Sequence, residues 1–382
     1  MKSAVIVDAV RTPVGKRGGQ LSAHHAVDLA SLPLKAITER NDLDPALVED
    51  VILGCVTQSG EQSFNVARNA ALAAGFPEEV PGTTVDRMCG SGQQAAHFAA
   101  QGVMAGVYDV VIAGGVESMS RVPMGYNAQG PGMPFGPKMS NRYANGLVPQ
   151  GISAEMIADK WGISRERLDS IAFDSHHRAA RATEEGRFEK QILPVETSTG
   201  VKTRDEGIRA DTSPEALAGL KPAFKSDGRV TAGNSSQISD GAAAVLIMSE
   251  DKADELGMKP MARFHSFALV GVDPVMMLTG PIPATSKVLD KAGLALDDID
   301  LFEVNEAFAS VIGAWLDETG ADWEKTNVNG GAIALGHPLG CSGAKLMTTL
   351  VHEMERSGAR WGLQTMCEGG GMANAVILER IA

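Results

Sequence analysis

Cys89-Gly90-Ser91-Gly92 opens an Ala-rich helical pattern, and Gly340-Cys341-Ser342-Gly343 opens a second one about 251 residues later. Two further features recur in the same order at nearly the same offset: the run 51–56 with 299–304, and the run 110–115 with 363–366 and the glycines 369–371. Self-similarity at a fixed offset is the sequence signature of repeated architecture. The sequence therefore predicts an internal duplication.

Short apolar runs alternate with helical patterns along both copies, which predicts an α/β fold with buried strands. Residues 118–235 have no counterpart in the second copy and are predicted to be an insertion. We expect one half from residues 1–117 plus 236–250, the inserted loop domain from 118–235, and the other half from 251–382. Within the insertion, Ser164 is expected to cap a helix over 165–185.

Composition and charge disfavour two classes of partner, membranes and nucleic acids. The chain has 382 residues, 44% of them hydrophobic, and a formal net charge of -13. Its longest apolar runs are far below the roughly 20 residues that cross a bilayer, so no membrane partner is expected. The acidic balance disfavours nucleic acid as a partner. Four cysteines without close pairing indicate a reducing compartment, which for this chain predicts the cytoplasm.

Four polar residues at strand or helix ends are candidates for chemistry. Cys89 stands at a helix N-terminus, where unpaired amides lower a thiol pKa and favour a nucleophile; the alternative is a small buried residue in a tight turn. His337 lies in the glycine-rich run 329–343, as a general base or as a satisfied core histidine. Cys367 is an acid/base or a packing thiol, and Asn305 holds a water or caps a helix.

Five separated motifs resemble the thiolases, the acetyl-CoA acetyltransferases and 3-ketoacyl-CoA thiolases, over essentially the whole chain. They are Asp86-Arg87-Met88-Cys89-Gly90-Ser91-Gly92, Val230-Thr231-Ala232-Gly233-Asn234-Ser235-Ser236, Asn305-Glu306-Ala307-Phe308, Gly336-His337-Pro338 and Cys367-Glu368-Gly369-Gly370. The resemblance implies a thiolase fold, two duplicated halves in five layers of helix, sheet, helix, sheet and helix with an inserted loop domain. It also implies a homo-oligomer, either a dimer or a tetramer.

The resemblance further implies the reaction. Cys89 is then the nucleophile that substrate acylates, His337 accepts its proton, and Cys367 is the acid/base. The expected activity is CoA-dependent thiolytic cleavage of 3-ketoacyl-CoA to acetyl-CoA and a shortened acyl-CoA, with Claisen condensation as its reverse.

The remaining family positions bind oxyanions and coenzyme A. One oxyanion hole is expected from His337 and a water held by Asn305, and another from the backbone amides of Cys89 and Gly369. Ser236 stands where the family contacts the pantetheine arm. Coenzyme A is therefore a cosubstrate, acyl-CoA is the other ligand, and no permanently bound cofactor is expected. No metal is expected either, because the histidine pairs lack metal-ligand spacing.

Some features set the chain apart from many short-chain biosynthetic thiolases. Those have a His-Met pair where this chain has Pro149-Gln150, so the acyl pocket is expected to differ. The stretches 54–63 and 93–94 resemble actinobacterial thiolases of fatty-acid or sterol side-chain breakdown. Acyl chain length, direction and the ligands of the CoA phosphates stay open. The rivals are a decarboxylating condensing enzyme, against which Cys367 argues, and a lipid carrier without turnover.

Overall fold

The two halves of the molecule repeat one order of strands and helices. The computed structural model describes residues 2–381, so residues 1 and 382 of the expected outer segments lie outside the description. The first half runs through β1 (Ala4–Arg11), α1 (Ala26–Arg40), β3 (Asp50–Gly54), α2 (Val66–Ala73), β4 (Gly82–Val85), α3 (Ser91–Met104), β5 (Val110–Ser118) and β8 (Ser239–Ser249). The second runs through β9 (Ala262–Gly271), α9 (Pro281–Ala292), β10 (Leu301–Val304), α10 (Ala309–Thr319), α12 (Leu339–Ser357), β11 (Trp361–Glu368) and β12 (Met372–Arg380).

Strand pairing repeats with the same order and direction. In the first half β3 is parallel to β5, and β5 and β1 both pair antiparallel with β8. In the second half β10 is parallel to β11, and β11 and β9 both pair antiparallel with β12. The predicted duplication is confirmed by this topology. The two sheets touch edge to edge through β1 and β9, which pair at only two positions.

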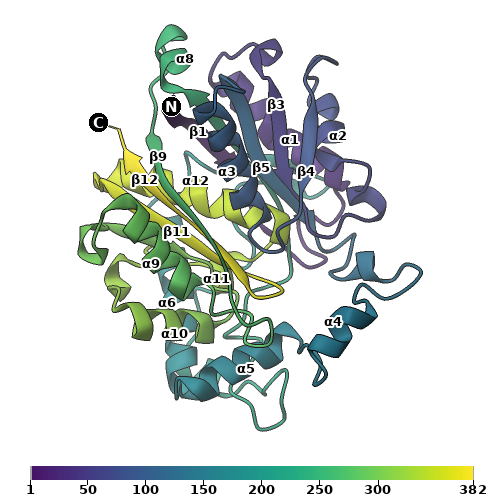
Figure 1. The fold of residues 1–382 in the computed structure, drawn as a ribbon, viewed down its shortest axis with the longest axis vertical. Coiled ribbons are helices and arrows are strands. Elements are labelled where there is room, and N and C mark those ends of the chain that lie inside the picture. Colours follow the sequence, from purple (N-terminus) through teal and green to yellow (C-terminus); the bar gives the residue numbers. More distant parts are fainter. Residues whose placement is uncertain (1, 382) are drawn as a thin grey trace.

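Helices cover the sheets in five layers, as predicted. Apolar residues of α1 and α2 pack on the outer face of the first sheet. Helices α3 and α12 lie between the two sheets, and α9 and α10 cover the outer face of the second sheet. Figure 1 shows the two sheets on either side of these central helices. Strands β5 and β8 are buried along their whole length because both of their faces are covered.

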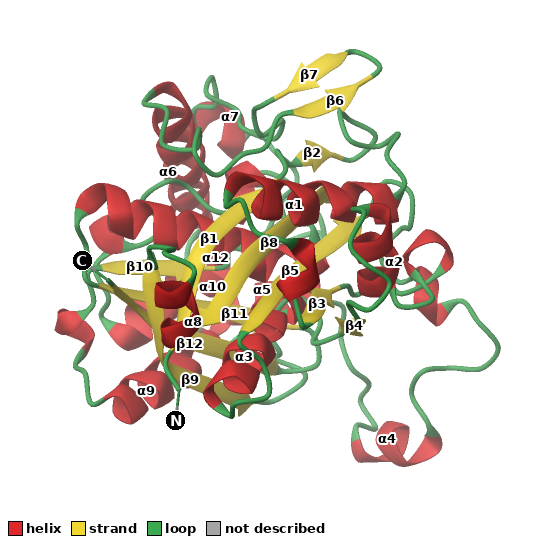
Figure 2. Cartoon of the chain, turned by 90° about the horizontal axis from the view of Figure 1, so that it is seen from above, coloured by secondary structure: helices red, strands yellow, loops and turns green. Residues whose placement is uncertain are grey.

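Residues 119–238 connect β5 to β8, whereas residues 369–371 alone connect the matching strands β11 and β12. The long connection contains α4 (Pro137–Arg142), α5 (Gln150–Lys160), α6 (Arg165–Glu184), β6 (Val195–Thr197), β7 (Gly200–Lys202) and α7 (Pro214–Ala218). The Ser164 side chain caps α6, as predicted. The exposed loops around α4 reach away from the sheets (Figures 1 and 2). The exact division of the chain into segments stays a prediction.

Shorter elements complete the fold: β2 (Gly15–Lys16), α8 (Glu250–Glu255), α11 (Ala332–Leu335) and 3₁₀ turns at Pro45–Leu47, Gly60–Gln62, Tyr126–Ala128, Leu296–Asp298 and Trp323–Lys325. No helix within residues 2–381 is both long enough and apolar enough to cross a bilayer.

Glycines let the two central helices approach each other at their first turns. A Cβ on Gly92 of α3 would lie 2.7 Å from the Gly340 carbonyl oxygen, and one on Gly343 of α12 would lie 2.1 Å from the Gln93 nitrogen. Both distances are too short for any side chain. The glycines therefore bring the turn before α3 against the turn before α12, and these turns carry Cys89 and His337.

Candidate active site

The turn between β4 and α3 presents Cys89. Met88 adopts a left-handed conformation with φ of 47°, which is uncommon for a residue with a side chain. The Ser91 hydroxyl holds this turn because it donates to the Met88 carbonyl oxygen at 2.6 Å and accepts from the Arg87 amide at 2.8 Å. Cys89 is 4% exposed. Its sulfur is therefore fixed by main-chain geometry in a nearly dry environment.

Burial, and not the helix terminus, dominates the ionisation of Cys89. Loss of hydration together with the nearby Glu368 raises the thiol pKa to about 11, against the opposing effect of donors from Gln150 and from the Gly369 backbone amide. The sequence predicted that the helix N-terminus lowers the Cys89 pKa, and this prediction is wrong for the free protein. A neutral thiol needs a base to become a nucleophile.

His337 is held in the tautomer that a base would need. The Ser342 hydroxyl donates to the Pro338 carbonyl oxygen at 2.8 Å and lies 2.6 Å from Nδ1 of His337. Because the single hydroxyl proton is used, Nδ1 carries the imidazole proton and Nε2 is free to accept another. Burial and the nearby Lys345 lower the His337 pKa to about 3, so the ring is neutral at rest.

The backbone before His337 also requires glycine. Gly336 has φ of 90°, and a Cβ there would lie 2.4 Å from the Ser239 hydroxyl oxygen. That same hydroxyl accepts from the His337 backbone amide at 3.2 Å. The conformation of Gly336 and the hydrogen bond of the His337 amide thus fix the backbone that carries the imidazole.

Asn305 joins the histidine to the second thiol. Its Nδ2 lies 3.4 Å from Nε2 of His337, and its side chain also opposes the rise in the Cys367 pKa. Its Oδ1 is buried without a partner among the described residues. A buried amide oxygen in that state suits a bound water.

Cys367 is completely buried at the end of β11. Burial raises its pKa well above the usual value, and the neighbouring Cys89 and Glu368 add to that rise. The thiol therefore keeps its proton at neutral pH. A protonated group held beside the nucleophile can act as an acid towards a carbanion that forms there.

Gly369 and Ser236 complete the predicted positions. The Gly369 backbone amide opposes the rise in the Cys89 pKa, and a Cβ at Gly369 would meet Gln150 Nε2 and Met88 Cγ no closer than 3.4 Å. A methyl group would therefore touch but not overlap these neighbours. The Ser236 amide donates to the Ala307 carbonyl oxygen at 3.0 Å, which places Ser236 beside the Asn305 segment.

Three residues near the centre had no predicted role: Ser342, Gln150 and Glu368. Ser342 and Glu368 stand inside recognisable motifs, but only the fold shows that one holds an imidazole and the other lies beneath the nucleophile turn. Gln150 belongs to the insertion, where the sequence predicted only that the acyl pocket differs at Pro149-Gln150.

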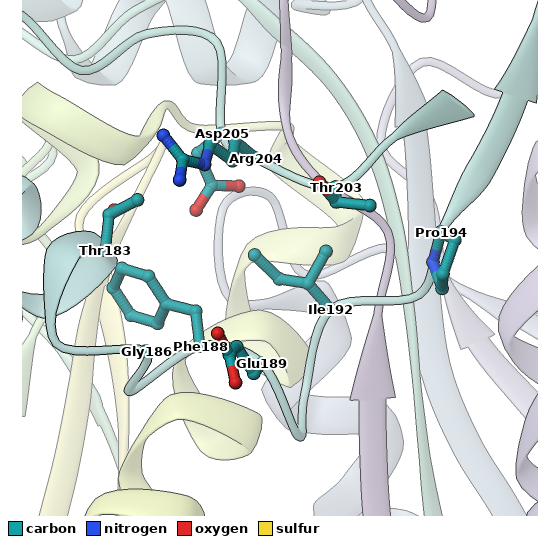
Figure 3. A pocket seen from close by; sticks show the side chains of 9 residues that line it. All are labelled: Thr183, Gly186, Phe188, Glu189, Ile192, Pro194, Thr203, Arg204 and Asp205. Carbon is teal, nitrogen blue, oxygen red and sulfur yellow. The ribbon is translucent and has the colours of Figure 1, made fainter. Parts of the chain in front are cut away.

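The described part of the chain also contains a cavity away from these residues, but no group of metal ligands. A cavity of about 300 Å³ extends between Thr183 at the end of α6 and Asp205, and none of the predicted site residues lines it (Figure 3). Within residues 2–381 no three His, Cys, Asp or Glu side chains are grouped to hold a metal ion, and all four cysteines are free thiols.

Comparison with known proteins identifies the family. Residues 4–251 match the thiolase N-terminal domain and residues 258–380 the thiolase C-terminal domain. The steroid 3-ketoacyl-CoA thiolase of Mycobacterium tuberculosis is 52% identical over 100% of this chain and 95% of its own. The 3-ketoacyl-CoA thiolase of Bacillus subtilis is 47% identical over 99% of this chain and 100% of its own.

A solved structure agrees with these matches. The Bacillus anthracis acetyl-CoA acetyltransferase has a TM-score of 0.91 and 42% identity, with 100% of this chain and 99% of that chain covered. The expected likeness to actinobacterial members is confirmed by the mycobacterial relative. Both thiolase domains are matched in order along the chain, and two thiols, an imidazole and an amide gather where the two domains join. This protein therefore belongs to the thiolase family.

Proposed function

We propose that the chain is an acyltransferase that cleaves 3-ketoacyl-CoA with CoA into acetyl-CoA and a shortened acyl-CoA, and that also catalyses the reverse condensation. The observation that carries this proposal is the pair of buried thiols around one neutral imidazole, since the reaction needs both a nucleophile and a separate acid/base. The names of the relatives, 3-ketoacyl-CoA thiolase and acetyl-CoA acetyltransferase, support the same chemistry.

In the first half-reaction, Nε2 of His337 takes the Cys89 proton as the sulfur attacks the 3-keto carbon. A carbon–sulfur bond forms, and the carbonyl electron pair moves to oxygen. When this oxyanion collapses, the bond between C2 and C3 breaks and its electron pair leaves with acetyl-CoA as an enolate. Cys367 gives its proton to that carbon, which releases acetyl-CoA and leaves an acyl group on Cys89.

In the second half-reaction, the Cys367 thiolate takes the proton of an incoming CoA thiol. The CoA sulfur attacks the acyl carbon, and Cys89 leaves as a thiolate that recovers its proton from His337. Both thiols and the imidazole thus return to their starting states, so no permanently bound cofactor is needed.

Two sets of donors would stabilise the oxyanions. One consists of the protonated His337 and a water on the free Oδ1 of Asn305, and the other of the Cys89 and Gly369 backbone amides. Removing one such donor typically costs about 3 to 4 kcal/mol of transition-state stabilisation. Ser236 is proposed to contact the pantetheine arm of CoA from its place beside Ala307.

We also propose a cytoplasmic homo-oligomer, dimeric or tetrameric. The family relationship supports this assembly. Light scattering of the purified chain distinguishes the two states, and a monomer would contradict the proposal.

The division of labour between the thiols is tested by Cys367→Ala. Exposure to acetyl-CoA followed by mass spectrometry should still show an acetyl adduct on the Cys89 peptide, whereas cleavage of acetoacetyl-CoA should collapse. Cys341→Ala removes a different buried thiol and should keep both steps. Equal loss of acylation and cleavage in Cys367→Ala would contradict the assigned roles, and an unacylated wild type would favour a carrier.

The substrate range is tested by CoA-dependent cleavage of a 3-ketoacyl-CoA series, from four carbons to a bulky sterol side chain. The name of the mycobacterial relative supports activity that rises with bulk. A kcat/KM that peaks at acetoacetyl-CoA would instead indicate a narrow acyl pocket.

A further inference from the structure

The inserted segment reaches the nucleophile through one side chain. Gln150 is the first residue of α5, and its side-chain amide opposes the rise in the Cys89 pKa. Its Nε2 would lie 3.4 Å from a Cβ on Gly369, at the same distance as the Cγ of Met88, so Gln150 fills the space between Gly369 and the turn that carries Cys89. A side-chain amide from the insertion therefore lies next to the Gly369 backbone amide at this turn.

The start of α5 is held rigidly enough to aim this donor. A Cβ on Gly151 would lie 2.1 Å from the Phe224 ring, so the helix packs against that ring without a gap. The Ser153 hydroxyl donates to the Met276 carbonyl oxygen at 2.8 Å. The Glu155 carboxylate accepts from the Val230 amide at 2.8 Å. Preorganised donors of this kind need no reorganisation when charge develops.

The two thiols are served in parallel ways. Asn305 opposes the rise in the Cys367 pKa, and Gln150 opposes the rise in the Cys89 pKa. Asn305 comes from the duplicated frame, whereas Gln150 comes from the connection between β5 and β8. Each sulfur that must carry negative charge during the reaction thus has its own side-chain amide.

We propose that Gln150 is a third donor of the nucleophile site, which stabilises the Cys89 thiolate and, with the Gly369 amide, the oxyanion formed next to it. This inference rests on the proposed function. No bond to Gln150 forms or breaks, because its amide only redirects a hydrogen bond from sulfur to oxygen as the negative charge moves. Hydrogen bonds to charged groups are roughly twice as strong as neutral ones, so the donor acts mainly on the charged species.

The test is the pH dependence of Cys89 alkylation by iodoacetamide, followed on the Cys89 peptide by mass spectrometry in wild type and Gln150→Leu. The alkylation midpoint should rise by about one pH unit in the variant, which corresponds to about tenfold less thiolate at a given pH. Acylation by acetyl-CoA should slow by about tenfold or more. Gln129→Leu makes the same substitution at an exposed position of the insertion and should change neither quantity.

Gln150→Glu provides a second variant of nearly the same shape in case leucine disturbs folding. Its carboxylate replaces a donor by a negative acceptor, so the alkylation midpoint should rise further than in Gln150→Leu. An unchanged midpoint in a folded Gln150 variant would overturn the role of this residue while wild-type acylation stayed intact. A wild type that is never acylated would instead overturn the proposed function itself.

Discussion

The turn before α3 and the turn before α12 stand at equivalent places in the duplicated fold and carry two different proposed reagents, a thiol and an imidazole. In the first, the Ser91 hydroxyl donates to the Met88 carbonyl and accepts from a backbone amide, which displays Cys89. In the second, the Ser342 hydroxyl donates to the Pro338 carbonyl and accepts from the His337 imidazole. The serine at this equivalent position thus stabilises the backbone in the first half and fixes the imidazole tautomer in the second. The duplicated frame sets where groups stand, and single side chains decide what each half contributes.

The comparison between the two turns is tested most strongly by removing the imidazole of the second half. His337→Ala should lower kcat/KM for acetoacetyl-CoA cleavage by about 10⁴-fold, because it deletes both a general base and a proposed oxyanion donor. Steady-state kinetics measures the loss, and His177→Ala, at an exposed histidine of α6, should keep wild-type rates. A loss below about tenfold would mean that another group takes the Cys89 proton.

The glycines where the two turns meet are the next target. In Gly340→Ala the new Cβ would lie 2.6 Å from the Cys55 Cα and from the carbonyl oxygens of Gly54 and Val116. All three are backbone atoms that cannot swing away, so we expect a destabilisation of about 3 kcal/mol or more. Thermal unfolding at one protein concentration measures it. Gly136→Ala, which meets nothing within 4 Å at an ordinary φ, should leave Tm unchanged.

The repeat explains how much the sequence could predict. Strands β5 and β8 are buried on both faces, so each contains a long apolar run that predicts a strand from the sequence. Strand β9 was not predicted because its residues alternate between buried and exposed and include Arg263 and His265. The family motifs predicted roles for Cys89, His337, Cys367, Asn305 and Gly369, and these roles stay predictions. The ionisation of Cys89 could not be predicted, because burial is a property of the folded chain, and Gln150 could not, because its contact spans the insertion.

Two glutamates at equivalent strand ends sharpen the comparison. Glu117 at the end of β5 accepts four hydrogen bonds, three of them from backbone amides, whereas both oxygens of Glu368 at the end of β11 are buried without partners among the described residues. Glu117→Gln sets an amide group against those donors and should cost about 2 to 3 kcal/mol of unfolding free energy. Glu368→Gln loses no hydrogen bond and should cost less than about 1 kcal/mol.

Burial raises the pKa of both glutamates. Burial raises the Glu368 pKa to about 8, above its unfolded value, so the ionised form is disfavoured in the folded chain. This carboxyl should therefore make the folded state less stable as pH rises from about 4.5 to 8. Urea unfolding at pH 5, 6.5 and 8 should show part of that decline removed in Glu368→Gln. An identical decline in wild type and variant would contradict the assignment.

The smallest expected effect is on the serine that distinguishes the two turns. Ser342→Ala removes the acceptor of the His337 Nδ1 proton, so the imidazole loses the bond that selects its tautomer. We expect kcat to fall by about tenfold with little change in KM, since the variant keeps the base but no longer aims it. Ser310→Ala is the matched control because Ser310 is equally buried and its hydroxyl has no partner within residues 2–381. If Ser342→Ala kept full kcat, the surrounding glycine-rich backbone alone would hold the imidazole, and the two serines would serve only their turns.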